Sequence, residues 1–589
     1  MRRLLPALVI AAACNSPQSA GTPNPSTAPA IPARLAAQFP EGWRLPTGQQ
    51  STFAPKVMAV SNSPEASAAA AEIMKAGGNA VDAAVALGFA LAVAWPEAGN
   101  IGGGGYSVVR MADGRSAVID YREIAPLAAT RDMYLDAKGN LTDKSVYGHL
   151  ASGVPGAVAG LTALLERYGT MPLSRVMQPA IRLAKEGFVV DTALGGSISR
   201  AQGMVNKYTG TPTPYFPRGT VVKAGEKLVQ PELARTLEAI AAQGAGAFYR
   251  GWIADSLVAE MTRGGGIITK ADLAKYTPVW RDALKTTYRG HTLLSMPPSS
   301  SGGIVVAEAL NVLEQYPQLP PYGSTQYFHL VGSAYQRAFV DRNAKLGDPA
   351  FVKVPIAELT SKDYARSLKA TIGPNAARTP ALEQQMNAIA PPKVREPEHT
   401  THYSVVDDKG NAVATTTTLN NSWGSGVWVH GAGFMLNDEM DDFAAAPGKP
   451  NMFGLVQGEA NAIQPGKRML SAMSPTIVLD RNNQILLVIG AAGGPTIITG
   501  TSQVILNVID NRMSLADAMR APRIHHQALP DSLTYEDGGI RPAVLDSLKA
   551  MGYNMRKLRS LVNVNAIMRV NGGWQGQPEP RRSGGAVGW

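Results

Sequence analysis

The spacing of apolar residues along the chain changes near residue 402 from a helical to an alternating period. Ahead of that point, the stretch at 63–65 predicts a helix start, because a serine cap precedes a proline at the first helical position. Asn79 is expected to cap a second helix over residues 81–93. Apolar side chains surround that helix on every side, so it should be buried. The region 170–390 also favours helices, joined by polar loops.

Strand patterns predominate from residue 402 onward. Four runs have the alternation and the β-branched residues of strands, with turn sequences between them: HYSVVD, NAVATTTTL, SPTIVLD and QILLVIG. The turn DDKG at 407–410 joins the first two runs, so they should pair as a hairpin. Helical spacing returns after Thr499. Helices before and after a block of strands indicate an α+β fold in which helices cover the sheets.

Composition narrows the classes of function. The chain has 589 residues, 45% of them hydrophobic and 17% charged, with a net charge of +10. Its basic residues form no long run, whereas nucleic-acid binding usually needs a clustered basic face. We therefore expect no nucleic-acid partner. A diffuse positive charge suits an anionic small substrate or an anionic surface.

The N-terminus has the pattern of an export signal. A basic MRR precedes the apolar stretch LLPALVIAAA, which is shorter than the ~20 residues of a membrane-spanning helix. Residues 1–13 are thus expected to be a signal peptide. Cys14, the only cysteine, resembles a bacterial lipoprotein acceptor; a chance cysteine in an ordinary cleaved signal is the alternative. Residues 14–53, rich in Pro, Ser and Ala, are expected to tether an exported, periplasmic protein that meets a membrane only through a lipid on Cys14.

The stretch EPEHTTHYSVVDDKG at 396–410 places two threonines just before the first predicted strand. Thr400 and Thr401 suit a pleated surface, and this structural reading is the commoner one. Alternatively, Thr400 is a nucleophile. A threonine hydroxyl needs a neighbouring base, and an N-terminal threonine has one in its own α-amino group, with a pKa near ~8. That chemistry requires cleavage of the bond between His399 and Thr400.

Distinctive motifs occur along the whole body of the chain. In order, they include GGNAVDAAVALGFALAVAWPEAGNIGGGGY, DYREIAP, SMPPSSSGG, TTHYSVVDDKGNAVATTTTLNNSWGSG, NDEMDDF, LSAMSPT, GAAGGPTIIT and APRIHHQ. From about residue 54 to residue 589, this series resembles the motifs of the γ-glutamyltransferases (glutathione hydrolases), which are N-terminal-nucleophile hydrolases. The length of the resemblance favours the nucleophile reading of Thr400.

The resemblance implies a four-layer αββα sandwich with an extensive helical portion in the large subunit. It implies a precursor that cuts itself between His399 and Thr400 into a large subunit, 54–399, and a small subunit, 400–589. Thr400 would then attack the γ-carbonyl of glutathione or another γ-glutamyl compound. The acyl group would pass to water or to an amino-acid or dipeptide acceptor. No cofactor is implied.

The resemblance also assigns roles to other residues. Some have an ordinary alternative: Arg122 could form a surface ion pair, and the acidic stretch 437–443 could be a solvated loop. By resemblance, Thr418 would orient Thr400, and the amides of Gly493 and Gly494 would form an oxyanion hole. Arg122 and Ser471 would bind the α-carboxylate of the substrate. Glu439 and Asp442, with help from Asn420, would bind its α-ammonium.

Two positions depart from the family pattern. Many members have a second serine where this chain has Ala472, which removes a hydroxyl from the carboxylate pocket. The stretch 447–454 resembles a substrate lid, in which Phe453 stands where well-known bacterial members have tyrosine. Phenylalanine covers a γ-glutamyl group but cannot hydrogen-bond to Asn420. We therefore expect a looser lid and an enzyme that leans towards hydrolysis.

Other readings remain open at this point. A cephalosporin or glutaryl acylase of the same superfamily would share the nucleophile, and a lipid-anchored periplasmic peptide-binding protein would share the length, signal and tether. Gly102 to Gly105 lack a phosphate-loop pattern and predict a tight loop near the site. His525 and His526 lack a third ligand at suitable spacing, so they are expected to be structural, and no metal site is expected.

Overall fold

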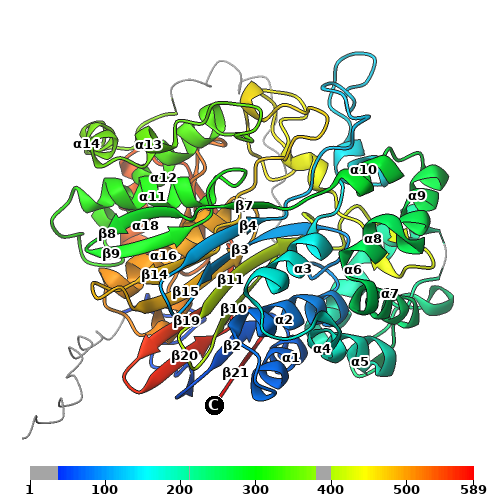
Figure 1. Cartoon of the computed structure of the whole chain (residues 1–589). Helices are drawn as coiled ribbons and strands as arrows, with labels where there is room; N and C mark the ends of the chain where they lie inside the picture. The colour runs from blue at the N-terminus through cyan, green and yellow to red at the C-terminus, as the bar shows by residue number, and fades with distance from the viewer. Residues whose placement is uncertain (1–37, 211, 380–399) are drawn as a thin grey trace, which may run out of the picture.

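Two seven-stranded sheets form the centre of the computed structural model, which describes residues 38–210, 212–379 and 400–589 (Figure 1). The paired strands within each of these sheets are antiparallel. The first sheet has the order β1 (Thr52–Ala54), β20 (Gly573–Gln577), β19 (Asn563–Val570), β15 (Ile485–Ala492), β14 (Thr476–Leu479), β9 (His291–Ser295), β8 (Leu284–Tyr288). The second has the order β21 (Gly585–Gly588), β2 (Met58–Ser61), β10 (Thr401–Val406), β11 (Ala412–Thr418), β3 (Gly104–Arg110), β4 (Ser116–Asp120), β7 (Val279–Arg281).

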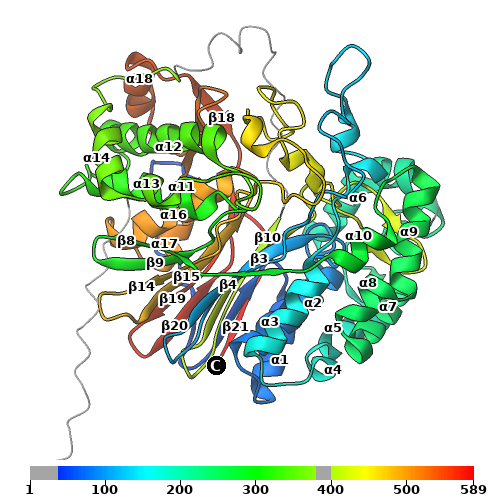
Figure 2. The same cartoon turned by 45° about the horizontal axis from the view of Figure 1, so that its top comes forward.

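Helices cover the outer face of each sheet and complete the four layers (Figure 2). Against the second sheet lie α1 (Pro64–Lys75), α2 (Ala80–Ala94) and α3 (Ala157–Tyr168), with α4 (Leu173–Val176), α5 (Gln178–Glu186), α6 (Thr192–Thr209), α7 (Pro231–Gln243), α8 (Ala245–Arg250), α9 (Trp252–Gly264) and α10 (Lys270–Lys275) around them. Against the first lie α11 (Gly302–Glu314) and α16 (Thr496–Ile509), with α12 (Thr325–Lys345), α13 (Ile356–Leu359), α14 (Lys362–Ala370), α17 (Leu515–Arg520) and α18 (Pro542–Ala550) around them. The predicted αββα sandwich is confirmed.

The capping signals place the first two helices correctly. The Ser63 hydroxyl accepts a hydrogen bond from the Ala66 amide at 3.2 Å, and α1 begins at Pro64. Asn79 forms a reciprocal capping box with Asp82 at the start of α2. Every residue of α2 is buried, as its all-round apolar pattern predicts, because the helix lies between the second sheet and the outer helices.

The predicted hairpin of β10 and β11 brings the start of β10 next to the end of β11, where the candidate site lies. β10 and β11 pair from Thr401 opposite Thr417 to Val406 opposite Ala412. The Asp407 carboxylate closes the turn by accepting the amides of Lys409 and Asn411. Because the strands are antiparallel, the residues before β10 and at the end of β11 lie side by side.

The tether predicted over residues 14–53 extends too far. From residue 38 the chain packs on the body: Trp43 is 7% exposed, and its indole N–H donates to the Arg520 carbonyl at 2.9 Å. β1 then pairs with β20. The sequence around Trp43 is polar and proline-containing, so only tertiary contacts order it. The predicted signal peptide 1–13, Cys14 and His399 lie outside the described residues.

Several strands were not foreseen. The region 170–390, predicted as mainly helical, also contains β7, β8 and β9 and the short strands β5 (Phe188–Val189) and β6 (Lys227–Leu228). Past the predicted C-terminal helices lie β16 (Ile524–His525), β17 (Leu533–Glu536), β18 (Met555–Leu558) and the sheet strands β19 to β21. The second half of the stretch Gly102–Gly105, predicted as a loop, begins β3. Glycine is needed there, because a Cβ at Gly104 would lie 2.5 Å from the Tyr121 carbonyl oxygen.

A neutral histidine is buried between the two sheets. His402 Nδ1 lies 2.9 Å from the Thr416 hydroxyl, and Nε2 lies 3.0 Å from the Ser404 hydroxyl. Its ring packs on Gly490 of the facing sheet. Burial lowers the pKa of His402 to about 3.

This burial predicts a loss of stability in mild acid. In the unfolded chain His402 takes up a proton near pH ~6.5, whereas the buried ring does not, so the unfolding free energy falls as pH falls from about 6.5 towards 3. Between pH 6.5 and 5 the loss from this one group is roughly 1.5 kcal/mol. Urea unfolding at the two pH values measures it. A His402→Asn variant should show a shallower pH dependence, and an unchanged one would contradict the assignment.

Candidate active site

Thr400 lies directly before β10, in a backbone conformation that threonine rarely adopts. Its φ is 72°, in the left-handed region, where a β-branched residue costs on the order of 1–3 kcal/mol. Its hydroxyl lies 3.0 Å from that of Thr418, the last residue of β11. The Thr418 oxygen also accepts the Asn420 amide at 2.8 Å. Thr418 thus holds the Thr400 hydroxyl in one place.

A single pocket joins most of the predicted site residues. Besides Thr400 and Thr418, it is lined by Arg122, Asn420, Glu439, Asp442, Phe453, Ser471 and Gly494, which the sequence nominated. Gly493 is the direct neighbour of Gly494. Ala472, which the family pattern placed in the carboxylate pocket, also lines it. The remaining lining residues were not nominated: Arg342, Leu455, Met473, Pro495 and Ile497.

Gly493 and Gly494 connect β15 to α16 beside the nucleophile. Their φ values are 143° and 59°, both on the side that favours glycine. Neither amide donates to an acceptor among the described residues. A Cβ at Gly494 would lie 2.8 Å from the Phe453 ring, so that ring covers the peptide. Two unused amides next to a hydroxyl nucleophile are suited to stabilising an oxyanion.

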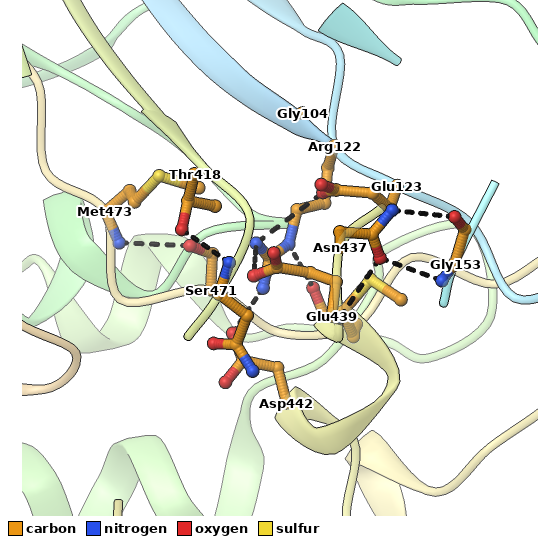
Figure 3. Close-up of polar contacts among 12 residues, drawn as sticks. Gly104, Arg122, Glu123, Gly153, Thr418, Asn437, Glu439, Asp442, Ser471 and Met473 are labelled. Atoms are coloured by element: carbon orange, nitrogen blue, oxygen red, sulfur yellow. Dashed lines mark hydrogen bonds and ion pairs between the residues drawn. The ribbon is translucent and has the colours of Figure 1, made fainter. Parts of the chain in front are cut away.

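Arg122 is the cationic centre of the pocket, and Figure 3 shows it between Glu439 and Asp442. Its guanidinium donates to one oxygen of each carboxylate. Burial by itself would lower the pKa of Arg122, but Glu439 and then Asp442 hold it above its ordinary value. A guanidinium and two carboxylates together can bind an α-amino acid group, which carries a carboxylate and an ammonium on one carbon. The guanidinium would bind the carboxylate of the ligand, and the two acids would bind its ammonium.

Two buried charged residues in this cluster were missed by sequence reasoning. Glu123 lies 3.7 Å from Arg122, and neither of its oxygens has a hydrogen-bond partner among the described residues. Burial raises the pKa of Glu123 to about 8, against the pull of Arg122. Arg342 donates to Ser301, Asn343 and Gln457, and burial lowers its pKa to about 10. Glu123 stands in the charged stretch DYRE at 120–123 and Arg342 in the stretch VDRNAK at 340–345, so no local pattern distinguished either residue from its charged neighbours.

The positive charge of Arg342 offsets part of the negative charge that Glu439 and Asp442 bring to the pocket. Burial raises the pKa values of both Glu439 and Asp442, and Arg122 lowers them. Arg342 also lowers that of Asp442. The Gln457 side chain links Arg342 to Asp442. Its oxygen accepts a hydrogen bond from Arg342, and its nitrogen donates one to the backbone carbonyl of Asp442 at 3.1 Å.

Ser471 and Asn420 both line this pocket. The Ser471 oxygen accepts the Met473 amide at 3.1 Å, which leaves its proton for a ligand. Asn420 has a φ of 75° and donates to the Asp438 carbonyl at 3.0 Å. It also contacts the Met452 sulfur at 3.7 Å, so it meets the lid-like stretch through methionine. Ala472 is 8% exposed and adds no hydroxyl.

Several hydrogen bonds anchor the lid-like stretch, two of them at Met452 and Phe453. The Met452 amide donates to the Asp441 carboxylate at 2.9 Å, and Asp441 also accepts the Ser145 hydroxyl at 2.8 Å. Burial raises the pKa of Asp441 to about 6. On the other side, the Gln527 side chain donates to the Phe453 carbonyl at 3.2 Å.

The two adjacent histidines lie away from the pocket. His525 hydrogen-bonds to Thr499 and Gln527, and burial lowers its pKa to about 4. His526 lies 3.4 Å from Asp531. Within the described ranges, no group of three or more His, Cys, Asp or Glu side chains is placed to hold a metal ion. Within the same ranges, no helix has both the length and the apolar character needed to cross a membrane.

Comparison with known proteins agrees with this geometry. The family model described as Gamma-glutamyltranspeptidase matches residues 66–589. The chain is 46% identical over 514 residues to the glutathione hydrolase proenzyme of Escherichia coli K12, which covers 87% of this chain and 88% of the relative. It is 39% identical over 519 residues to the Acylase ACY 1 proenzyme of Pseudomonas sp. SE83, covering 87% and 89%.

A solved structure shares nearly the whole fold. The crystal structure of cephalosporin acylase from Bacillus halodurans superposes with a TM-score of 0.81 at 28% identity, over 93% of this chain and 99% of that one. Two facing antiparallel sheets between helical layers, with a threonine at the edge of a central strand, define an N-terminal-nucleophile hydrolase fold. Within that class, the chain belongs to the γ-glutamyltranspeptidase family.

Proposed function

We propose that this protein is a self-processing γ-glutamyltransferase and glutathione hydrolase. One observation carries the proposal: the Thr400 hydroxyl shares a pocket with Arg122, Glu439 and Asp442, the groups that suit an amino-acid head. The match to the family model and the curated glutathione hydrolase proenzymes supports it.

In the processing step, the Thr400 hydroxyl attacks the carbonyl carbon of His399. The peptide C–N bond breaks, an ester forms on Thr400 Oγ1, and the nitrogen is released as the Thr400 α-amine. Water then hydrolyses the ester. The products are a large piece ending at His399 and a small piece, 400–589, whose new amine is the base for turnover.

In the turnover step, Thr400 Oγ1 attacks the γ-carbonyl of glutathione and forms a γ-glutamyl ester. Cysteinylglycine leaves with its amine protonated. The amides of Gly493 and Gly494 would stabilise the oxyanion, at ~2.7–4 kcal/mol per donor. Arg122 and Ser471 would bind the α-carboxylate, and Glu439, Asp442 and Asn420 the α-ammonium. Water, an amino acid or a dipeptide would then take the acyl group.

Two matched substrates separate this function from that of an acylase. A glutaryl group is a γ-glutamyl group without the α-amine, so Glu439 and Asp442 have no ammonium to bind in it. We expect γ-glutamyl p-nitroanilide to be cleaved with kcat/KM at least about tenfold above that of glutaryl p-nitroanilide, since one charge-assisted contact is worth about 1.5–3 kcal/mol. A preference for the glutaryl compound would favour the acylase reading. Hydrolysis of neither would favour the peptide-binding reading.

Phe453 predicts a weak transfer activity. Its ring covers Gly494 but offers no hydroxyl to Asn420, whose contact with the lid goes through Met452. A Phe453→Tyr variant should raise the ratio of transfer to hydrolysis, by about twofold to tenfold if one neutral hydrogen bond of ~0.5–1.5 kcal/mol closes the lid. Product analysis with glutathione and a dipeptide acceptor measures the ratio. A Phe453→Leu variant is the matched control, and a Tyr variant with an unchanged ratio would contradict the role.

We also propose that the protein is exported and lies in the periplasm. The basic and apolar start of the sequence supports removal of residues 1–13, and Cys14 supports attachment of a lipid. The mass of the N-terminal peptide from membrane and soluble fractions tests both points. A free cysteine at position 14 in the mature protein would overturn lipidation and leave the export proposal standing.

A further inference from the structure

A second cavity lies at the opposite end of the sandwich from Thr400, beside the turn that joins β10 to β11. It has a volume of about 460 Å³ and opens between the two sheets. Its lining residues come from the hairpin turns β10–β11, β14–β15 and β19–β20 and from the ends of β1 and β3. β11 runs from this end to Thr418, so its seven residues separate the two places by roughly 20 Å.

Four cations from four separate segments line this hairpin-end cleft: Lys56, Arg110, Lys409 and Arg569. Among the described residues, none of them has a carboxylate within ion-pair distance. Arg569 donates to the Gln484 side chain at 3.2 Å, and Arg110 donates to the Met111 carbonyl. Arg110 is only 8% exposed. Asp113 on the β3–β4 turn lies near Arg110, but its carboxylate accepts hydrogen bonds from the Arg115 amide and side chain, which lower its pKa more than the charge of Arg110 does. A buried guanidinium without a direct carboxylate partner is costly unless an anion joins it.

The acids of the cleft do not neutralise these cations. Asp407 is engaged in the turn and at the start of α2: its oxygens accept the amides of Ala80, Lys409 and Asn411 and the Asn411 side chain. Asp408 is exposed and has no cation within ion-pair distance among the described residues. Positive charge therefore exceeds negative charge around the cavity.

We propose that the hairpin-end cleft binds the phosphate group of a small phosphate ester, either free or as the headgroup of an anionic lipid. The forked donors of Arg110 and Arg569 suit a doubly charged tetrahedral anion, and Lys56 and Lys409 add point charges at the rim. The volume exceeds that of phosphate alone and lies in the range of small-molecule sites. Trp574 and Val570 supply an apolar wall for the rest of the ester.

Glycerol 3-phosphate and lipid vesicles test the proposal on the full-length processed protein. Calorimetry measures glycerol 3-phosphate binding, and co-sedimentation compares phosphatidylcholine vesicles with and without phosphatidylglycerol. In a Lys409→Gln/Arg569→Gln variant we expect binding at least tenfold weaker. An Arg481→Gln/Lys285→Gln variant removes the same charge, with Arg481 on the β14–β15 turn but directed to the Arg289 carbonyl, and should bind like wild type. Unchanged γ-glutamyl hydrolysis reports that both variants are folded.

The outcomes separate the sources and can overturn the site. Binding of glycerol 3-phosphate alone identifies a free ester, and binding of anionic vesicles alone identifies a lipid headgroup, provided that the cleft variant loses it. Saturable binding of neither probe overturns the proposal. Equal losses in the two variants also overturn it, because diffuse surface charge would then account for the attraction.

Discussion

Replacing Thr400 by alanine should leave the chain uncut and inactive. The variant lacks the oxygen that attacks His399 and the γ-glutamyl carbonyl, so both the processing and the turnover steps lose their nucleophile. Loss of a hydroxyl nucleophile typically costs on the order of 10⁶-fold in kcat. Gel electrophoresis reports the cleavage, and release of p-nitroaniline from the γ-glutamyl anilide reports the activity.

Two neighbouring variants show whether the effect belongs to this hydroxyl. Thr400→Ser retains an oxygen at the same place, so it should still process and turn over. Thr401→Val removes the adjacent hydroxyl, which donates a hydrogen bond to the Asn62 side chain at a distance of 3.0 Å. Thr401 does not line the pocket, so this variant should process like wild type. Cleavage in Thr400→Ala at the wild-type rate would mean that another group cuts the chain.

Replacing Arg122 by glutamine should give the second-largest loss. Arg122 would donate two charge-assisted hydrogen bonds to the α-carboxylate, each worth about 1.5–3 kcal/mol, so kcat/KM should fall about a thousandfold or more. Removing the cation also leaves Glu439 and Asp442 without their partner, and the melting temperature should fall with it. Kinetics with γ-glutamyl p-nitroanilide, together with a thermal melt, measure both effects.

A substrate without the α-carboxylate distinguishes two causes of the loss in Arg122→Gln, namely lost binding of that carboxylate and damage to the fold. 4-Aminobutanoyl p-nitroanilide lacks the α-carboxylate, so it should be a poor substrate for wild type and lose little more in Arg122→Gln. Arg122→Lys keeps the charge but not the fork and should recover only part of the activity. Equal losses for the two anilides in Arg122→Gln would show that Arg122 supports the structure without touching the carboxylate.

Local pattern predicted the parts of the fold that depend on neighbours in sequence. The turn at 407–410 sets the register of β10 and β11, and this register brings Thr400 to Thr418. Ser63 and Asn79 start their helices as expected, since a cap acts on the next turn alone. The strands β20 and β21 were missed because they are short and contain glycine, and β19 was missed because its alternation is incomplete; pairing with distant strands decides the state of all three.

The contacts within the pocket could not be predicted from local pattern. Arg122 and Glu439 are 317 residues apart, and only the complete sandwich brings them together. The same holds for Phe453 over Gly494 and for Arg342 behind Asp442. Sequence reasoning nominated most of the pocket through the family resemblance and missed Glu123 and Arg342, whose roles depend on burial rather than on a motif.

The most direct test of the account is the intact mass of the purified protein, with N-terminal sequencing of each piece. The account predicts two pieces, the smaller one spanning 400–589 and beginning TTHYSVV. Such a piece would establish Thr400 as an N-terminal residue with its own amine as base. A single chain that stays uncut after long incubation at neutral pH would contradict the central claim, and Thr400 would then be a residue that only precedes a strand.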